Sequence, residues 1–360
     1  MRKKMRKSLV LIGLPFGLAF ILLGLTTVIE AAEGVKPVTL KYSTYIAPTS
    51  WHGELHQWWA NEVDKRTGGK VKIQTFWMES LSKHKDGLPA VQSGICDLTW
   101  LSSTYHPSQL PLFMIVDNPF NFGNDYVASV LAIIDTMEKE ASLKAELDRE
   151  NIINVMPHIS GFTQLGSKKC FGSLADLKGK TLRTYGGARA RYYELLGANP
   201  IFMSYTEIYE AIDRGTVSAY DCAVVLSHGF KHYEVTKCIL MINAGGALAS
   251  GVYMNLKTFK GLPQDVQKML LDLRREYGVK MAQKQMDDEQ KHFNEWKTKY
   301  GVTLQNLTAA DQKINMEAGK SAQEYMLKKQ ESDGHKAVRK VWDYYMTARM
   351  KYEGERAKKK

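Results

Sequence analysis

The sequence has only four cysteines, and none stands in the paired spacing of a zinc site or a redox dithiol. They are Cys96, Cys170, Cys222 and Cys238. Most of them are expected to be small buried residues. Export to an oxidising compartment permits a disulfide, but the sequence does not select the two partners.

Motifs of common nucleotide-binding and hydrolytic enzymes are missing as well. The chain has no Gly-x4-Gly-Lys-Ser/Thr loop, no Gly-x-Gly-x-x-Gly after a strand, and no Gly-x-Ser-x-Gly elbow. His52 and His56 have metal-ligand spacing, but no third ligand accompanies them, so a solvated or capping role is expected. Cations and aromatics are interspersed along the chain, which gives no support for a nucleic-acid groove. An exported chain without catalytic motifs suggests a protein that binds a ligand and has no cofactor.

Much of the net charge of +11 lies at the amino terminus. Five cations fall within residues 2–7, and residues 9–29 carry no charge, which is the pattern of a secretory signal peptide. Cleavage is expected after Ala31 or one residue later; loss of residues 1–31 leaves 44 Lys and Arg against 37 Asp and Glu, a net charge of +7. The alternative is a retained anchor, because about 20 apolar residues cross a bilayer. Pro15 and the small residues near Ala31 favour cleavage and a soluble periplasmic protein.

A length of 360 residues predicts two lobes, and the hydrophobic pattern predicts two cycles of strand and helix. The first cycle comprises strands at 38–45, 71–75 and 97–101 with helices from Trp51 and at 88–93. The second comprises strands at 152–158, 180–184, 200–203 and 218–224 with helices at 188–196 and after a capping box at 204–207. Alternating strands and helices indicate parallel sheets covered by helices. A long helix from Pro263 to about Lys299, a strand at 302–307 and two helices follow.

Arg183 is the best candidate for a ligand-binding residue. It stands at the end of the predicted strand 180–184, and Tyr185-Gly186-Gly187 then turns into a helix. A guanidinium there can hold a carboxylate in a bidentate pair, and a helix amino terminus adds its dipole. The alternative is a salt bridge between the lobes.

Three segments in this region resemble the periplasmic solute-binding proteins of tripartite ATP-independent periplasmic (TRAP) transporters, the DctP-like family. They are residues 174–183 (LADLKGKTLR), 195–200 (LLGANP) and 205–215 (YTEIYEAIDRG). The amino-terminal half agrees at residues 63–69, 90–97 and 109–113. The resemblance covers nearly the whole mature chain, and the order and spacing of the segments are more specific than any one motif.

The resemblance implies a two-lobed α/β periplasmic binding protein (type II-like), with hinge strands and a long helix spanning both lobes. It implies lobe I at 32–157 with a return segment at about 248–262, lobe II at 158–247, and C-terminal helices at 263–350. A basic tail at 351–360 is expected to be frayed or disordered from Arg356. The resemblance also implies capture of a small organic acid by hinge closure and its delivery to the membrane subunits of a TRAP transporter.

Arg183 falls on the carboxylate-binding arginine of that family. The family usually has Asp where this chain has Ser218, and its ligand-holding acidic pair is Asp221-Cys222 here. Some relatives hold a metal ion in this neighbourhood; Asp221 is the one candidate ligand, without a convincing set of partners. Thr163 occupies a position that is often arginine in sialic-acid binders, which disfavours that ligand.

Further candidates for the ligand cleft come from the ends of the predicted strands. They are Thr44, Tyr45, Trp77, Ser102, Ser103, Thr104, Phe162, Gln164, Tyr220 and Asp221. Several are aromatic, which suggests a ligand with an apolar or aromatic body beside its carboxylate. Two other functions remain open: an exported enzyme with Asp221, Glu207 or His158 as general acid or base, and a sensory ligand-binding subunit.

Overall fold

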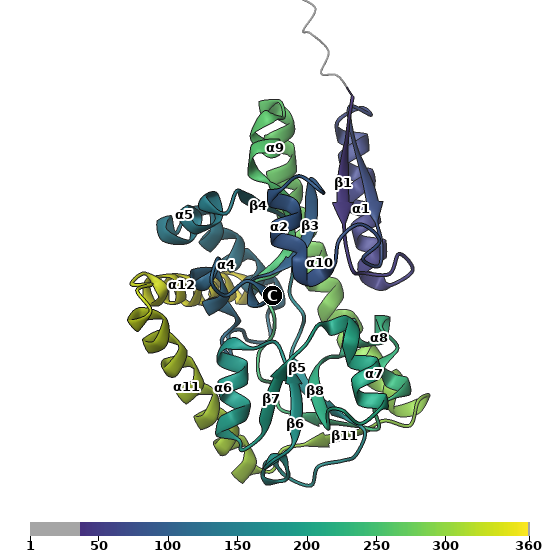
Figure 1. Ribbon diagram of the computed structural model, residues 1–360, viewed down its shortest axis with the longest axis vertical. Helices are drawn as coiled ribbons and strands as arrows, with labels where there is room; N and C mark the ends of the chain where they lie inside the picture. The colour runs from purple at the N-terminus through teal and green to yellow at the C-terminus, as the bar shows by residue number, and fades with distance from the viewer. Residues whose placement is uncertain (1–36, 359–360) are drawn as a thin grey trace, which may run out of the picture. The chain divides into compact units, whose positions relative to one another are not determined.

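The computed structural model describes residues 37–358, which form two mixed α/β lobes (Figure 1). The expected signal segment at 1–31 lies outside the described residues. Within them, no helix is both long and apolar enough to span a bilayer.

The sheet of lobe I has five strands in the order β2-β1-β3-β10-β4. Their bounds are β1 Val38–Ser43, β2 Val71–Phe76, β3 Leu98–Ser102, β4 Ile152–Pro157 and β10 Ser250–Asn255. β1 pairs in parallel with β2 and β3, whereas β10 runs antiparallel to both β3 and β4. The parallel arrangement predicted for the strands between residues 38 and 101 is therefore confirmed, but β10 adds an antiparallel strand between β3 and β4 that was not predicted. β10 is reversed because it returns directly from lobe II, without the crossover helix that a parallel neighbour requires.

The sheet of lobe II has six strands in the order β11-β9-β5-β8-β6-β7. Their bounds are β5 Thr163–Ser167, β6 Thr181–Thr184, β7 Asn199–Phe202, β8 Ala219–Ala223, β9 Cys238–Met241 and β11 Thr303–Asn306. β6, β7 and β8 are parallel, but β5 runs antiparallel to β8 and β9. The edge strand β11 comes from the C-terminal part of the chain and pairs with β9. A segment that was expected among the C-terminal helices thus completes this sheet.

Helices cover both sheets. Lobe I carries α1 Trp51–Arg66, α2 Gly87–Gln92, α3 Pro111–Met114, α4 Tyr126–Lys139, α5 Ala141–Arg149 and α9 Leu256–Gly261. Lobe II carries α6 Gly187–Leu195, α7 Ile208–Asp213 and α8 Val224–Gly229. The capping box at 204–207 is present and opens a short 3-10 turn, Tyr205–Glu207, that leads into α7.

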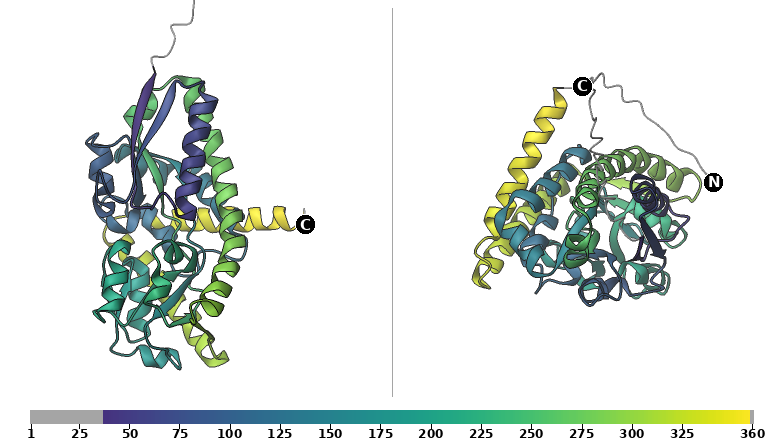
Figure 2. Two further views of the ribbon diagram at one scale, coloured as in Figure 1. Left: turned by 90° about the vertical axis from the view of Figure 1, so that its right-hand side faces the viewer. Right: turned by 90° about the horizontal axis from the view of Figure 1, so that it is seen from above.

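Three C-terminal helices join the lobes: α10 Gln264–Thr298, α11 Ala309–Ser332 and α12 Val338–Ala357. α10 contacts α4 and β4 in lobe I and α8 and β11 in lobe II, and in the left view of Figure 2 it runs alongside both lobes. α11 packs on α6, and α12 packs on α4.

The prediction of a frayed tail from Arg356 is wrong, because α12 continues to Ala357. Two contacts with α4 hold its last turns. The Tyr352 hydroxyl donates to Asp135 at 2.8 Å, and Arg356 pairs with Asp125 at 2.8 Å. The basic residues near the end therefore have partners that the sequence pattern did not reveal.

Two extended segments cross between the lobes side by side. Ser160 N donates to the Ala247 carbonyl at 3.1 Å, and Thr163 N donates to the Gly245 carbonyl at 2.6 Å. Gly246 is required here, because a Cβ at this position would lie 2.2 Å from the Gly161 carbonyl oxygen. These segments form the only direct strand-like connection between the two sheets in the described chain, where a hinge is expected.

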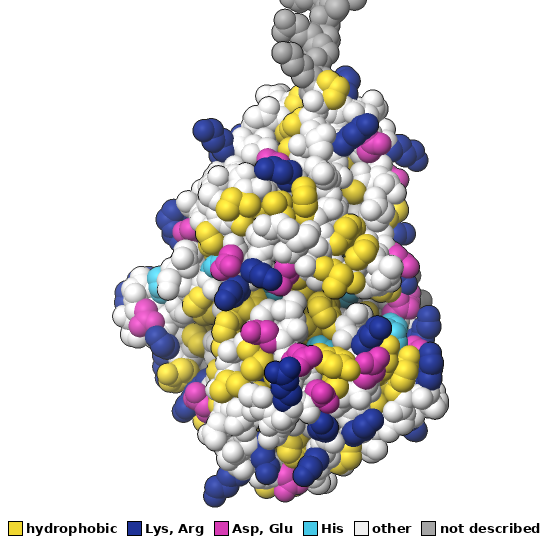
Figure 3. Space-filling view, turned by 45° about the vertical axis from the view of Figure 1, so that its right-hand side comes forward, with side chains coloured by type: hydrophobic (Ala, Val, Ile, Leu, Met, Phe, Trp, Pro, Cys, Tyr) yellow, Lys and Arg dark blue, Asp and Glu magenta, His cyan; other side chains and the backbone are white. Residues whose placement is uncertain are grey.

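The structure pairs two of the four cysteines. Cys170 and Cys238 form a disulfide at the start of β9, and Cys96 and Cys222 are buried free thiols. On the face drawn in Figure 3, Lys and Arg side chains are scattered and interspersed with Asp and Glu.

Candidate functional site

A small cavity lies where the two lobes meet the crossing segments. Lobe I contributes Tyr45, His84, Trp100, Ser102 and Tyr105, lobe II contributes Tyr185, Tyr205 and Leu226, and the crossing segments with their flanking strand ends contribute His158, Ser160, Ala247 and Ser250. The cavity volume is about 20 Å³, room for about one water molecule. Entry of an organic molecule therefore requires the lobes to move apart.

The wall from lobe I is a set of packed rings. Tyr45 follows β1 and stacks on His84 with ring centroids 4.0 Å apart and planes 4° from parallel. Trp100 of β3 meets Tyr45 edge-on at 5.5 Å. The ring centroid of Phe230 in lobe II lies 5.7 Å from that of Tyr45, so the stack continues across the boundary between the lobes. These residues form flat apolar walls with few rotameric alternatives.

Arg183 of β6 lies behind the wall from lobe II and is fully buried. Its guanidinium carbon is 4.3 Å from the ring centroid of Tyr185 and 5.2 Å from that of Tyr205, and both rings line the cavity. Nε and Nη2 donate to the Met203 carbonyl at 3.1 and 3.0 Å. Nη1 is buried and has no partner. None of the ion pairs of residues 37–358 includes Arg183.

Asp221, the carboxylate expected beside Arg183, is engaged elsewhere. It is fully buried in β8, and its two oxygens accept from the Thr184 hydroxyl at 2.6 Å and the Tyr193 hydroxyl at 2.5 Å. The predicted alternative for Arg183, a salt bridge between the lobes, is not formed. A buried cation without a counter-ion is costly, and an anion that enters the cleft relieves that cost.

The other ionisable groups around the cavity are neutral near pH 7. Burial, with a smaller contribution from the charge of Arg183, lowers the pKa of His84 to about 3. Burial also lowers the pKa of His158 to about 3. Burial raises the pKa of Tyr45 and Tyr205 well above the ordinary value. Arg183 is thus the charged group whose guanidinium packs directly on two rings of the cavity lining.

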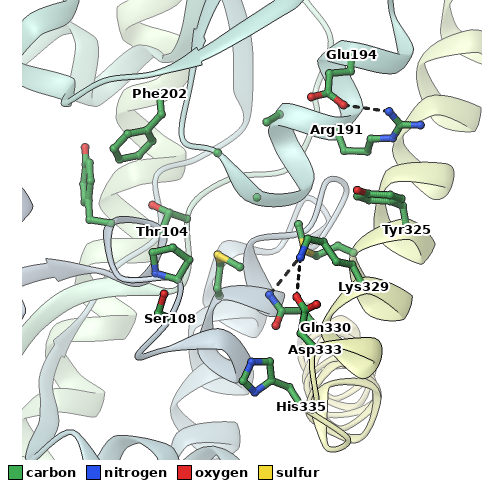
Figure 4. A pocket seen from close by; sticks show the side chains of 17 residues that line it. Thr104, Ser108, Arg191, Glu194, Phe202, Tyr325, Lys329, Gln330, Asp333 and His335 are labelled. Atoms are coloured by element: carbon green, nitrogen blue, oxygen red, sulfur yellow. Dashed lines mark hydrogen bonds and ion pairs between the residues drawn. The ribbon is translucent and has the colours of Figure 1, made fainter.

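A larger, open pocket of about 790 Å³ lies outside the small cavity (Figure 4). α6, the loop after β3 and the end of α11 form its walls, and two ion pairs flank it, Arg191–Glu194 and Lys329–Asp333. Tyr105 lines both spaces and therefore separates them. Phe202 of β7 packs edge-on against Tyr105 at 5.1 Å, and the Tyr105 hydroxyl accepts from Tyr205 N at 3.3 Å. Tyr105 is therefore one of the residues of lobe I that contact lobe II.

The structure brings some of the predicted cleft residues to these spaces. Tyr45 and Ser102 line the inner cavity, and Thr104 lines the outer pocket. Thr104 and Ser102 share a hydrogen bond of 2.9 Å. Ser103 is fully buried, and its hydroxyl has no partner.

Other predicted residues lie away from the cavity lining. Trp77 is half-buried and stacks on His56, with centroids 6.4 Å apart. Phe162 packs against Phe122 and Tyr126.

Two more predicted residues serve the sheet of lobe II and its connection to lobe I. Gln164 bonds Asn243 through both ends of its amide, at 2.6 and 2.9 Å. Tyr220 is fully buried, and its hydroxyl meets Thr236 at 2.9 Å.

Sequence reasoning missed most of the lining. His84, Trp100, Tyr105, Tyr185 and Tyr205 come from five separate segments, and no spacing in the chain connects them. His158 was considered only as a possible acid or base. The one available signal was the enrichment of aromatic residues after predicted strands. His52 and His56 are buried in lobe I, which corrects the expectation of a solvated or capping role; His56 Nδ1 bonds the Tyr42 hydroxyl at 3.0 Å.

One group of side chains in the described chain has metal-ligand spacing: His228, His292 and Glu295. The Trp296 indole donates to His228 Nδ1 at 3.1 Å. The neutral His228 ring then carries its proton on Nε2, the nitrogen that faces Glu295 at 3.9 Å. That nitrogen is not free to bind a metal. Asp221 does not belong to this group.

Two α/β lobes, two segments that cross between them and a cavity where they meet are typical of a two-lobed solute-binding protein. The chain belongs to the bacterial extracellular solute-binding proteins, family 7 (DctP), whose family model matches residues 42–330. This family works in solute transport outside the cytoplasmic membrane, and its members deliver ligands to TRAP transporters.

Known relatives are similar in sequence or in structure over most of this chain. A solute-binding protein of Verminephrobacter eiseniae is 27% identical over 283 residues, which cover 78% of this chain and 83% of the relative. The solved structure of a TRAP periplasmic solute-binding protein from Desulfovibrio salexigens, an open complex, is 26% identical with a TM-score of 0.71 and covers 88% of this chain and 97% of that one. A TRAP solute-binding protein from Rhodoferax ferrireducens, solved with benzoate, shares the fold with a TM-score of 0.78 at 20% identity, over 88% of this chain and 99% of that one.

Proposed function

We propose that this chain captures a small organic acid in the cleft between its lobes and presents it to the membrane subunits of a TRAP transporter. The carrying observation is Arg183, a fully buried guanidinium with an unpartnered Nη1 and no carboxylate in contact. A ligand carboxylate supplies the missing counter-charge.

The proposed mechanism is hinge closure. In the separated lobes, the acid reaches Arg183 past Tyr185 and Tyr205. Closure then brings Tyr45 and Tyr105 of lobe I over the ligand and expels water, and the Tyr105 contacts with Phe202 and Tyr205 N hold the lobes together. The closed surface is what the membrane partner recognises, and no bond is made or broken.

The residues considered as acids or bases of an exported enzyme are engaged in other hydrogen bonds. Glu207 accepts from Ser204 N at 2.7 Å in the capping box, and Asp221 accepts from two hydroxyls. His158 Nδ1 is hydrogen-bonded to Ser250 at 3.0 Å. These contacts favour a binding role. The extracellular role of the family and the basic, then charge-free, amino-terminal segment support export of the chain to the periplasm by residues 1–31.

Titration calorimetry on the mature chain with a panel of small carboxylates tests this function. We expect at least one acid to bind and to raise the melting temperature, and chromatography to show it unchanged after incubation. Arg183→Gln should weaken that binding at least about tenfold, as expected for one charge-assisted pair. Equal affinity in Arg183→Gln would remove the proposed site, and a converted acid would favour an enzyme.

A further inference from the structure

The inner cavity is lined without a single Lys, Arg, Asp or Glu. Seven of its twelve lining residues carry rings, three are serines, and the remaining two are Leu226 and Ala247. Arg183 acts on the cavity from behind Tyr185 and Tyr205. The other buried arginine of lobe II, Arg189, lies outside the lining and donates to the Ala244 carbonyl at 3.3 Å. The cavity therefore offers one positive charge at one end and neutral surface elsewhere.

The neutral surface is flat. The rings of Tyr45 and His84 are stacked with their planes 4° from parallel, and those of Tyr185 and Tyr205 lie 15° from parallel with centroids 6.3 Å apart. Trp100 and Tyr105 close the sides with their edges turned toward these rings. Parallel ring faces with perpendicular edges complement a flat ring better than a puckered or branched aliphatic body.

Two neutral histidines add hydrogen-bonding capacity to the lining. Both ring nitrogens of His84 are buried without a partner, and so is Nε2 of His158. A neutral imidazole provides one donor and one acceptor, and leaving them unmatched in a buried site costs free energy. A hydroxyl, amide or ring nitrogen on the ligand would satisfy them.

Building on the proposed function, we propose that the ligand is a planar ring carboxylate with a single negative charge, whose ring carries a neutral polar group that hydrogen-bonds His84. The ring lies between the aromatic walls, and its carboxylate points to Arg183.

A second carboxylate on the ligand has no place in this arrangement. It would lie among tyrosines, neutral histidines and Trp100, because the lining contains no cation to pair with it. Burying an unpaired carboxylate costs several kcal/mol, more than a neutral hydroxyl in the same place. The cleft therefore binds dicarboxylates more weakly than monocarboxylates, because it has no positive charge to pair with the second carboxylate.

Calorimetric titration of the mature wild-type chain with matched acids tests this selection. Benzoate is the reference, the 3- and 4-hydroxybenzoates add a neutral polar group, and isophthalate and terephthalate place a second carboxylate at the same positions. Cyclohexanecarboxylate and succinate remove planarity and the ring. We expect at least one hydroxybenzoate to bind about fivefold tighter than benzoate, through one added hydrogen bond. Both ring dicarboxylates and both aliphatic acids should bind at least about threefold weaker than benzoate.

The variant His84→Phe tests whether His84 hydrogen-bonds the neutral polar group of the ligand. This variant keeps a ring stacked on Tyr45 and removes both nitrogens, so we expect the ratio of hydroxybenzoate affinity to benzoate affinity to fall to about one, whatever its effect on benzoate itself. His106→Phe is the matched control, because His106 is a buried histidine outside the cavity lining. It should keep the preference, with melting temperatures confirming that both variants fold.

The outcomes separate this inference from the proposed function. If succinate or a ring dicarboxylate binds at least as tightly as benzoate and Arg183→Gln abolishes that binding, the planar monocarboxylate is wrong and the arginine site stands. If His84→Phe keeps the full preference, the role of His84 is wrong. Failure of every ring monocarboxylate to bind the wild type also overturns the inference. Binding that Arg183→Gln leaves intact overturns the proposed function itself.

Discussion

Arg183 and Arg274 are both buried arginines, but their surroundings differ. Arg274 lies on α10 with its side chain 3% exposed, pairs with Glu138 of α4 and donates to the Asn154 carbonyl at 3.2 Å. Arg183 lies on β6, and its neighbours are one carbonyl and two aromatic rings. One buried cation has its carboxylate within the chain, and the other does not.

The difference separates a cation that is paired within the fold from the one that we propose to bind the ligand. The Arg274 contacts tie α10 to α4 and β4, so the charge and its partner stabilise the packing of the long helix on lobe I. Arg183 has only partial compensation from ring faces, each worth about 0.5–2 kcal/mol. A site that binds an anion tightly needs such an uncompensated charge, and the fold bears its cost while the ligand is absent.

Arg274→Met should produce the largest loss of stability. It leaves Glu138 with Arg275 as its remaining partner at 2.8 Å and removes the bond to Asn154. We expect the free energy of unfolding to fall by about 2 kcal/mol, less than for a fully buried pair because Glu138 is 30% exposed. Urea denaturation measures this loss, and calorimetry should show unchanged affinity for the acid ligand. An unchanged midpoint would mean that the Arg274 pair is not structural.

The affinity for a monocarboxylate should change less than about twofold between about pH 5.5 and 8. Burial holds the pKa of His84 and of His158 at about 3, so both stay neutral over this range, while Arg183 stays charged and the ligand stays ionised. A lining histidine that gained a proton here would strengthen anion binding as the pH falls. Calorimetry at several pH values, with buffers of different protonation enthalpy, detects such an uptake, and a tenfold gain at pH 5.5 would contradict the neutral lining.

Trp77→Leu should leave the ligand affinity unchanged. Trp77 follows β2 at a strand end, as Tyr45 follows β1, but it stacks on His56 outside the lining. Tyr45→Leu is the matched variant inside the lining and should weaken binding several-fold through the lost ring face. Equal losses of affinity in the two variants would show that the cleft extends to Trp77.

The sequence allowed the two-lobed α/β fold to be predicted and Arg183 to be selected as a candidate, because strand alternation, helix caps and the 174–183 segment are local signals. It did not reveal that β10 and β5 run antiparallel, since a strand that returns from the other lobe has the same local pattern as one after a crossover. A strand at 302–307 was predicted and is confirmed as β11, but its pairing with β9 was not predicted. Pairing partners are set by tertiary packing.

The ligand cavity was harder to predict than the fold. Among the strand-end candidates, Tyr45 reaches the inner cavity while Trp77 and Tyr220 do not, although all three follow or lie in predicted strands. The side of the sheet on which a side chain emerges depends on register, and a shift of one residue reverses it. His84 and Tyr105 lie in short 3-10 turns, which have no hydrophobic period to identify them.

Arg183→Met tests the central claim most directly, because methionine fills similar space without the charge. Urea unfolding of the ligand-free variant should give a free energy of unfolding no lower than that of the wild type, in contrast to the loss in Arg274→Met. Calorimetry on the same sample should show affinity for the acid ligand reduced at least about tenfold. A loss of stability as large as that of Arg274→Met, with the affinity retained, would show that Arg183 holds the fold and that the carboxylate binds elsewhere.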